Sequence, residues 1–67
     1  MGLESKVIAE VNEILKDSNP NFYSGTLFVT CNEEEAMQVV ENLEAYVVNC
    51  KVKHYGPIQG EYAFDFV

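Results

Sequence analysis

Positive charge is the scarcest property of this 67-residue chain, which has no arginine, four lysines and one histidine against eleven acidic residues. The formal net charge is therefore −7 at pH 7. A protein that binds DNA or RNA through phosphates needs a basic surface that releases counterions, and anionic membranes attract basic segments. The sequence thus predicts no direct binding to nucleic-acid phosphates and no membrane binding.

Long apolar runs are also missing. No segment approaches the roughly 18 apolar residues that cross a bilayer, and Glu4 and Glu10 stand where a signal peptide would be basic and then apolar. We therefore expect a cytoplasmic protein. The absence of arginine beside six asparagines is typical of AT-rich coding genomes, such as those of many bacteria and phages.

Cysteine and histidine are too few for the usual metal and catalytic sites. Cys31 and Cys50 show neither CxxC spacing nor neighbours at zinc-ligand distances. We expect two buried free thiols and no cofactor, with a Cys31–Cys50 disulfide as the alternative if their strands are neighbours. His54 is expected to be a structural residue, because Cys50 lies about 13 Å away along an extended strand. The sequence therefore predicts that the protein is not an enzyme.

The apolar content is high enough for a folded domain. Hydrophobic residues make up 48% of the chain, whereas disordered acidic segments are poor in such residues. We expect one domain over residues 1–67. A domain of this size buries only about 60% of its unfolded surface, so a partner subunit would add stability.

Two helices are predicted from apolar spacing. Residues 3–17 carry apolar side chains three and four positions apart, and Pro20 lies in the segment that ends this helix. Asn32 is expected to cap the second helix, with Glu35 closing a capping box. The Glu33–Glu35 run therefore fits a helix start better than a metal site. The second helix is expected to end near Tyr46.

Three strands are predicted from alternating and β-branched patterns, over residues 26–31, 48–54 and 61–67. The last two are expected to form a hairpin in which Lys51 and Lys53 lie opposite or diagonal to Glu61 and Asp65. Residues 55–60 contain two glycines but lack the lysine and helix of a phosphate-binding loop. They are expected to form the turn, with Tyr55 and Ile58 exposed to a partner.

These elements give the order α-β-α-β-β, an α+β domain with a three-stranded sheet in the order 1-3-2 and two helices on one face. The strand-helix-strand-strand portion resembles the front half of a ferredoxin-like fold. The resemblance is one of architecture, so it implies no family function.

Phe28 has two interpretations. If the helices cover only the face that holds Leu27 and Val29, Phe28 lies on an open face and its strand is an edge where two copies can pair. Alternatively, Phe22, Tyr23 or the other helix covers it.

The predicted function is that of a small acidic, non-enzymatic interaction module that binds itself, as a homodimer, or another protein. The alternatives are a small-molecule-binding regulatory domain, a phage-like acidic inhibitor that imitates nucleic acid, and carboxylates that only keep the domain soluble. The candidate contact residues are Glu10, Glu13, Asp17, Glu41, Glu44, Phe28, Tyr55 and Ile58.

Overall fold

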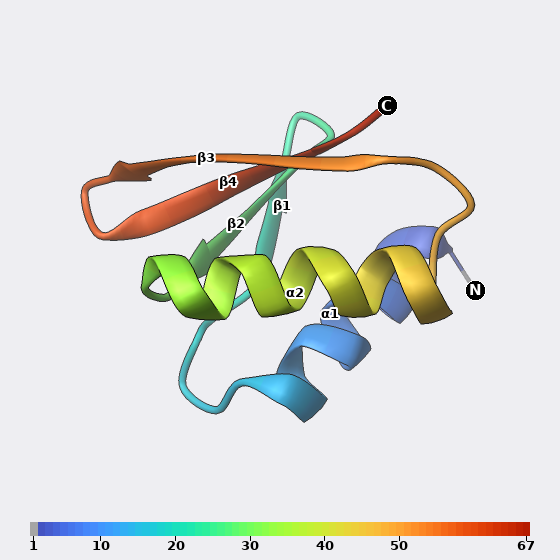
Figure 1. Ribbon diagram of the computed structural model, residues 1–67, viewed down its shortest axis with the longest axis horizontal. Coiled ribbons are helices and arrows are strands. Elements are labelled where there is room, and N and C mark those ends of the chain that lie inside the picture. The colour runs from blue at the N-terminus through green and yellow to red at the C-terminus, as the bar shows by residue number, and fades with distance from the viewer. Residues whose placement is uncertain (1) are drawn as a thin grey trace.

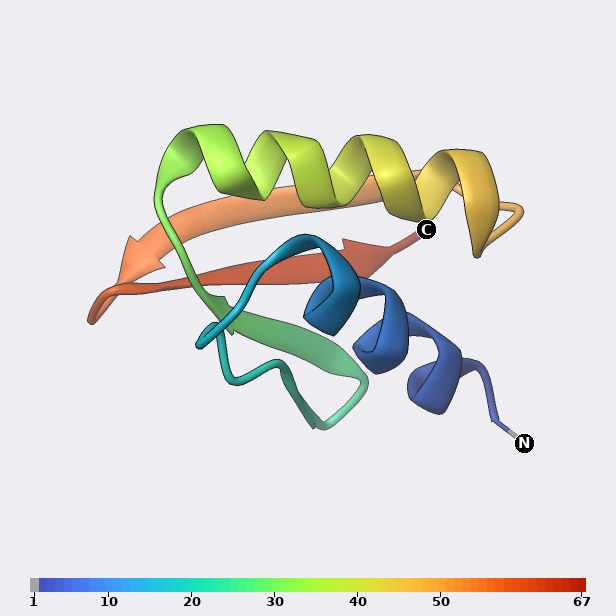
Figure 2. The same cartoon turned by 90° about the horizontal axis from the view of Figure 1, so that it is seen from below.

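Two helices pack on one face of a four-stranded antiparallel sheet in the computed structural model, which describes residues 2–67 (Figure 1). The elements are α1 (Leu3–Ile14), β1 (Asn21–Tyr23), β2 (Thr26–Thr30), α2 (Glu33–Tyr46), β3 (Val52–Ile58) and β4 (Glu61–Phe66). The sheet order is β1-β2-β4-β3. A view turned by 90° shows α1 and α2 on the same side of the strands (Figure 2). The α+β class is confirmed, but the prediction of three strands is wrong.

The capping of α2 is confirmed. The Asn32 side chain accepts a hydrogen bond from the Glu35 amide at 2.8 Å, and the Asn32 amide donates to Glu35 Oε1 at 3.0 Å. Each side chain thus accepts a hydrogen bond from a backbone amide that would otherwise have no partner at the start of the helix. Ala36, Val39 and Leu43 point into the core, and the helix ends at Tyr46 as expected.

Helix α1 ends earlier than predicted. Leu15 is already extended, and Asp17 and Asn19 adopt positive φ angles of 63° and 48° that an α-helix does not allow. The carbonyl of Ser18 accepts a hydrogen bond from the Thr30 amide at 2.8 Å. This bond ties the segment after α1 to β2, so the chain leaves the helix before residue 17.

The additional strand β1 forms a hairpin with β2. Ser24 and Gly25 make a two-residue turn with φ angles of 53° and 83°, the positive values that suit a twisted hairpin. Phe22 lies opposite Leu27 and stacks on Phe66 of β4, with ring centroids 6.0 Å apart. Strand β2 therefore lies between β1 and β4, and the prediction that it forms a sheet edge is wrong.

The β3–β4 hairpin has a shorter turn than predicted. Only Gln59 and Gly60 form the turn, with φ angles of 52° and 83°, so Tyr55 and Ile58 belong to β3 and not to a loop. The strand pairing shifts between these two residues, and Gly56 within that irregularity has a φ of 138°. The predicted strand over residues 48–54 therefore begins later and extends further.

The register of this hairpin agrees with only part of the predicted charge pairing. Lys53 lies opposite Asp65, as expected, whereas Glu61 lies opposite Ile58. Lys51 pairs with Val67 through two backbone hydrogen bonds of 2.9 and 3.2 Å, which places it diagonal to Asp65 as expected.

The core lies between the sheet and the helices. Its buried members come from every element except β1 and include Val7, Val11, Leu15, Leu27, Val29, Ala36, Val39, Leu43, Val48, Val52, Tyr62 and Phe64. Tyr62 and Phe64 of β4 thus point toward the helices.

Candidate functional site

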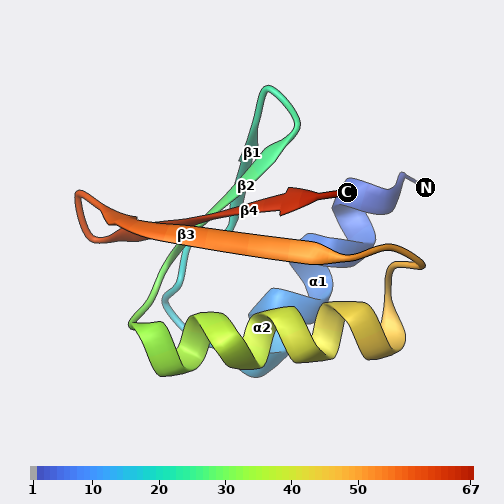
Figure 3. The same cartoon turned by 45° about the horizontal axis from the view of Figure 1, so that its top comes forward.

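The face of the sheet opposite the helices is uncovered by any element of residues 2–67 (Figure 3). We call this surface the open face. Strand alternation and register place on it Asn21, Tyr23, Thr26, Phe28, Thr30, Lys53, Tyr55, Ile58, Glu61, Ala63 and Asp65. It contains three of the eight candidate contact residues predicted from the sequence, namely Phe28, Tyr55 and Ile58.

The centre of the open face is a row of apolar side chains from three neighbouring strands. Ala63 of β4 lies opposite Phe28 of β2 on one side and Tyr55 of β3 on the other. Ala63 is 0% exposed, whereas Phe28 is half-buried and Tyr55 is 46% exposed. Because Phe22 faces the helices through its contact with Phe66, it does not cover Phe28. Phe28 therefore lies on the open face opposite Ala63, and its strand is not an edge.

A carboxylate joins three strands on this surface. Asp65 Oδ1 accepts a hydrogen bond from Thr26 Oγ1 at 2.9 Å, and its Oδ2 accepts one from Tyr55 Oη at 3.2 Å. Partial burial raises the pKa of Tyr55, and the hydrogen bond to Asp65 and the charge of that carboxylate raise it further. Asp65 thus fixes the position of the Tyr55 ring on the open face.

A shallow hollow lies at the β1 side of the open face. It has a volume of about 250 Å³ and is lined by Asn21, Tyr23, Phe28 and Glu61. The lining combines two aromatic rings with an amide and a carboxylate. A cavity of about 150 Å³ accommodates a benzene ring, so this hollow has room for an aromatic or branched side chain.

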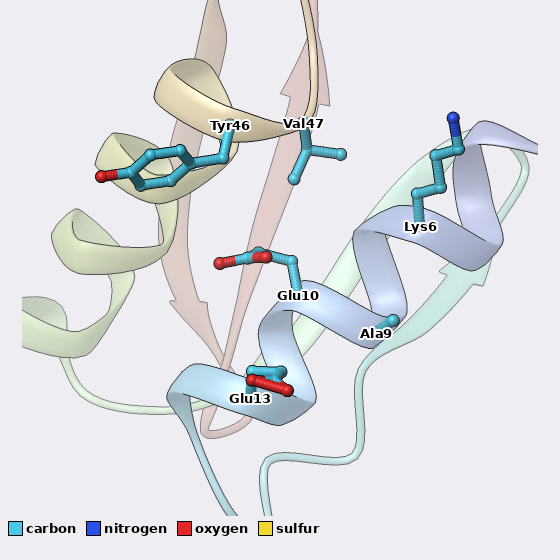
Figure 4. A pocket seen from close by; sticks show the side chains of 6 residues that line it. All are labelled: Lys6, Ala9, Glu10, Glu13, Tyr46 and Val47. Atoms are coloured by element: carbon cyan, nitrogen blue, oxygen red, sulfur yellow. The ribbon is translucent and has the colours of Figure 1, made fainter.

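The five acidic candidates do not converge on one site. Glu10 and Glu13 line a groove of about 390 Å³ with Lys6, Ala9, Tyr46 and Val47, between α1 and the end of α2 (Figure 4). Glu41 lies on the exposed side of α2, and Asp17 lies in the loop after α1. These four carboxylates are therefore divided among three places on the helix side.

The fifth acidic candidate, Glu44, has an internal partner. Its Oε2 accepts a hydrogen bond from the Val52 amide at 2.8 Å. This contact joins the last turn of α2 to the first residue of β3, which gives Glu44 a structural role.

The histidine and the cysteines lie apart from one another. His54 is half-buried beside the rings of Tyr62 and Phe64, with centroids 6.0 and 6.2 Å away. Cys31 precedes α2 and Cys50 follows it, so about 20 Å of helix separates the two thiols and the alternative of a disulfide is wrong. Both are free, but Cys31 is only half-buried and Cys50 is exposed, so the prediction that both are buried is wrong. Burial and the nearby Glu35 carboxylate raise the pKa of Cys31 to about 11.

Within residues 2–67, no group of three or more histidine, cysteine or acidic side chains is arranged to hold a metal ion. No helix in the same range is long and apolar enough to cross a membrane.

Sequence reasoning missed Asn21 and Tyr23 as parts of the open face, and it missed the two hydrogen bonds that Asp65 accepts there. The Ser24-Gly25 pair between Asn21–Tyr23 and Thr26–Thr30 is a hairpin signal that predicts β1 and its outward side chains. The role of Asp65 depends on Thr26, which is distant in sequence, so no local pattern predicts it.

Comparisons of the chain with known protein families, curated proteins and solved structures found no match.

Proposed function

We propose that this protein is a small, non-enzymatic interaction module that binds another protein chain through the open face. The observation that supports it is the position of Tyr23, Tyr55 and Ile58, which are 72%, 46% and 50% exposed on the one sheet face without a covering layer. Exposed aromatic and aliphatic side chains gathered on one surface mark protein contact sites, and tyrosine is enriched in such interfaces.

The charge distribution supports the same surface. Residues 1–46 contain nine acidic residues and two lysines, a net charge of −7, whereas residues 47–67 contain two of each and are neutral. The acidic side chains of α1 and α2 thus lie on the layer away from the open face and favour solubility. The apolar side chains are left on the nearly neutral layer, where they can be buried without desolvating many carboxylates.

We place the activity in the cytoplasm. Cys31 and Cys50 are free, and unpaired thiols persist in reducing compartments. The proposed location rests on these two free thiols alone.

Site-specific photo-crosslinking in cells tests the proposal. A benzophenone amino acid replaces Tyr55 on the open face or, as the control, Met37, which is 55% exposed on α2. We expect a protein adduct from position 55 and little from position 37. Equal adduct formation at both positions, or none at position 55, would contradict the open face as the contact surface.

The groove that contains Glu10 and Glu13 supports a second candidate function, which is to bind a basic segment of another protein. The two carboxylates outnumber the single lysine of the lining, Lys6, and attract cations, and the exposed Tyr46 ring beside them offers a cation–π surface. Glu10→Gln/Glu13→Gln would then weaken binding to a lysine-rich peptide, and binding would decrease with salt. Unchanged binding in this variant would remove the second candidate.

A further inference from the structure

We infer that the occupant of the open face is a second copy of this chain, packed sheet to sheet about a two-fold axis that runs parallel to the strands. The inference rests on the proposed function and names its partner. Charge and the condition of the sheet edges restrict how two copies can pack, and the pattern of side chains across the open face supports sheet-to-sheet contact.

Charge limits how two copies can approach. Each chain carries −7, so contact between two acidic helix layers is repulsive. The open face carries Lys53 beside Asp65 and Glu61, and Asp65 already accepts two hydrogen bonds. Sheet-to-sheet packing brings these nearly balanced surfaces together and keeps the helix layers on the outside.

Edge-to-edge pairing is the competing way to join two sheets, and both edges are poorly suited to it. Strand β1 has only three residues and follows Pro20. Strand β3 contains the register shift between Tyr55 and Ile58, and Pro57 within it has no amide to donate. Short strands, prolines and irregular pairing are the features by which edges avoid further pairing.

The pattern across the open face selects the direction of the axis. With the axis perpendicular to the strands, β4 lies over β4 and brings Asp65 of one copy toward Glu61 of the other. With the axis parallel to the strands, β4 lies over β2, so that Asp65 faces Thr26 and Ala63 faces Phe28. The second arrangement opposes no like charges, and aligned packing of two sheets is a common geometry.

The same axis places β3 of one copy over β1 of the other. Lys53 then lies against Tyr23, where an ammonium group and an aromatic ring attract each other. Tyr55 lies over the hollow that Asn21, Tyr23 and Phe28 help to line, which has room for its ring. The two copies exchange this contact twice because a two-fold interface repeats every pair.

The interface is small. Strand rise and spacing give the open face a projected area of about 300 Å², below the roughly 800 Å² per partner of standard stable complexes. We therefore expect a reversible dimer whose population depends on concentration over the micromolar to millimolar range.

Sedimentation equilibrium with two matched pairs of variants tests the inference. Tyr23→Ser and Ile58→Ser alter the open face, whereas Tyr46→Ser and Met37→Ser alter helix-side residues that are 78% and 55% exposed. We expect the first pair to raise the dimer dissociation constant about tenfold and the second pair to leave it unchanged. Circular dichroism checks that each variant is folded.

Ionic strength provides a second measure. Raising salt from about 20 to about 300 mM screens the repulsion between two acidic copies, so dimerisation should strengthen. A folded chain that stays monomeric at millimolar concentration overturns the second copy as occupant. Dimerisation that is weakened equally by the open-face and the helix-side variants also overturns the second copy as occupant. Crosslinking from position 55 to a different protein would then keep the proposed function while rejecting this partner.

Discussion

Tyr55 and Asp65 lie on neighbouring strands of the open face, and the Tyr55 hydroxyl donates a hydrogen bond to Asp65 Oδ2 at 3.2 Å. Because Thr26 donates to the other oxygen of the same carboxylate, Asp65 connects β2, β4 and β3. A single side chain thus stabilises the sheet and holds the Tyr55 ring that we place over the hollow of the second copy.

Replacing Asp65 should affect both the free energy of unfolding and the ionisation of Tyr55. Asp65→Ala removes two acceptors, so we expect a loss of about 1 kcal/mol in urea unfolding. The pKa of Tyr55 should fall toward its ordinary value of 10.0, because the bonded carboxylate helps to raise it. Ultraviolet titration of the tyrosines measures this shift.

Tyr62 is an internal control for that titration. Burial and the charges of Glu33 and Cys31 raise its pKa, and none of these depends on Asp65. Its late ionisation should therefore persist in Asp65→Ala. If both tyrosines, or neither, titrate earlier in the variant, the assigned role of Asp65 is wrong.

Glu44 should contribute to stability through its bond to the Val52 amide. We expect Glu44→Ala to lower the free energy of unfolding by about 1–2 kcal/mol, because a charge-assisted hydrogen bond is lost. Glu44→Gln keeps an acceptor and should lose less. Glu41→Ala, on the exposed side of the same helix, should stay within about 0.5 kcal/mol of the parent. Equal losses at positions 41 and 44 would count against this contact.

Gly56 is predicted to be intolerant of any side chain. Its φ is 138°, and an added Cβ would lie 3.1 Å from the Glu61 carbonyl oxygen. Gly56→Ala should therefore cost about 1–3 kcal/mol, as for other sparsely populated backbone conformations. Gly2→Ala, where the nearest atom is 4.0 Å away, is the matched control. Thermal unfolding of the two variants compares the costs, and a Gly56→Ala protein as stable as the control would refute the assigned strain.

The two thiols should differ in reactivity. Because burial and Glu35 raise the pKa of Cys31 to about 11, very little of this thiol is ionised at pH 8, and the thiolate is the reactive form. Exposed Cys50 should react with a disulfide reagent first, and Cys31 much more slowly. Cys50→Ser should abolish the fast phase, whereas its persistence in that variant would contradict the assignment.

The same raised pKa makes stability depend on alkaline pH. The unfolded thiol ionises near its ordinary pKa of 9.0 and the folded thiol near 11, so the unfolded state loses its proton first. The contribution of Cys31 is complete below pH 9 and is lost as the pH rises toward 11. Cys31→Ser should show a smaller decline in stability across this interval, measured by urea unfolding.

Local signals in the sequence account for most of the fold. The Asn32 capping box and the apolar spacing of residues 33–46 predicted α2 to within a residue of its observed start and end. The boundaries of β3 could not be predicted in this way, because Gly56 and Pro57 are typical of a turn but lie within a strand whose pairing shifts there. Tertiary pairing with β4 overrides the local preference.

The candidate site was less predictable for the same reason. Tyr55 and Ile58 were identified as exposed contact residues, but their shared surface with Phe28 depends on the register of three strands. Glu44 looked like any other helix carboxylate, since only the path of the chain into β3 brings the Val52 amide to it. Contacts between elements decide which polar side chains are free.

The orientation of the proposed dimer leads to opposite expectations for two charged replacements of Tyr23. In an arrangement with the axis parallel to the strands, position 23 faces Lys53 of the second copy. Tyr23→Lys should weaken dimerisation more than Tyr23→Glu, because a lysine there opposes another lysine and a glutamate opposes a cation. Both variants lose the ring of Tyr23 and differ only in the charge at that position. The overall repulsion between two acidic chains would make the lysine variant dimerise better. Stronger dimerisation of the glutamate variant would therefore show a local contact with Lys53. Adding Lys53→Glu to Tyr23→Lys should restore association in sedimentation experiments. If the lysine variant dimerises better than the glutamate variant at every salt concentration, β3 does not lie over β1 and the axis has a different direction.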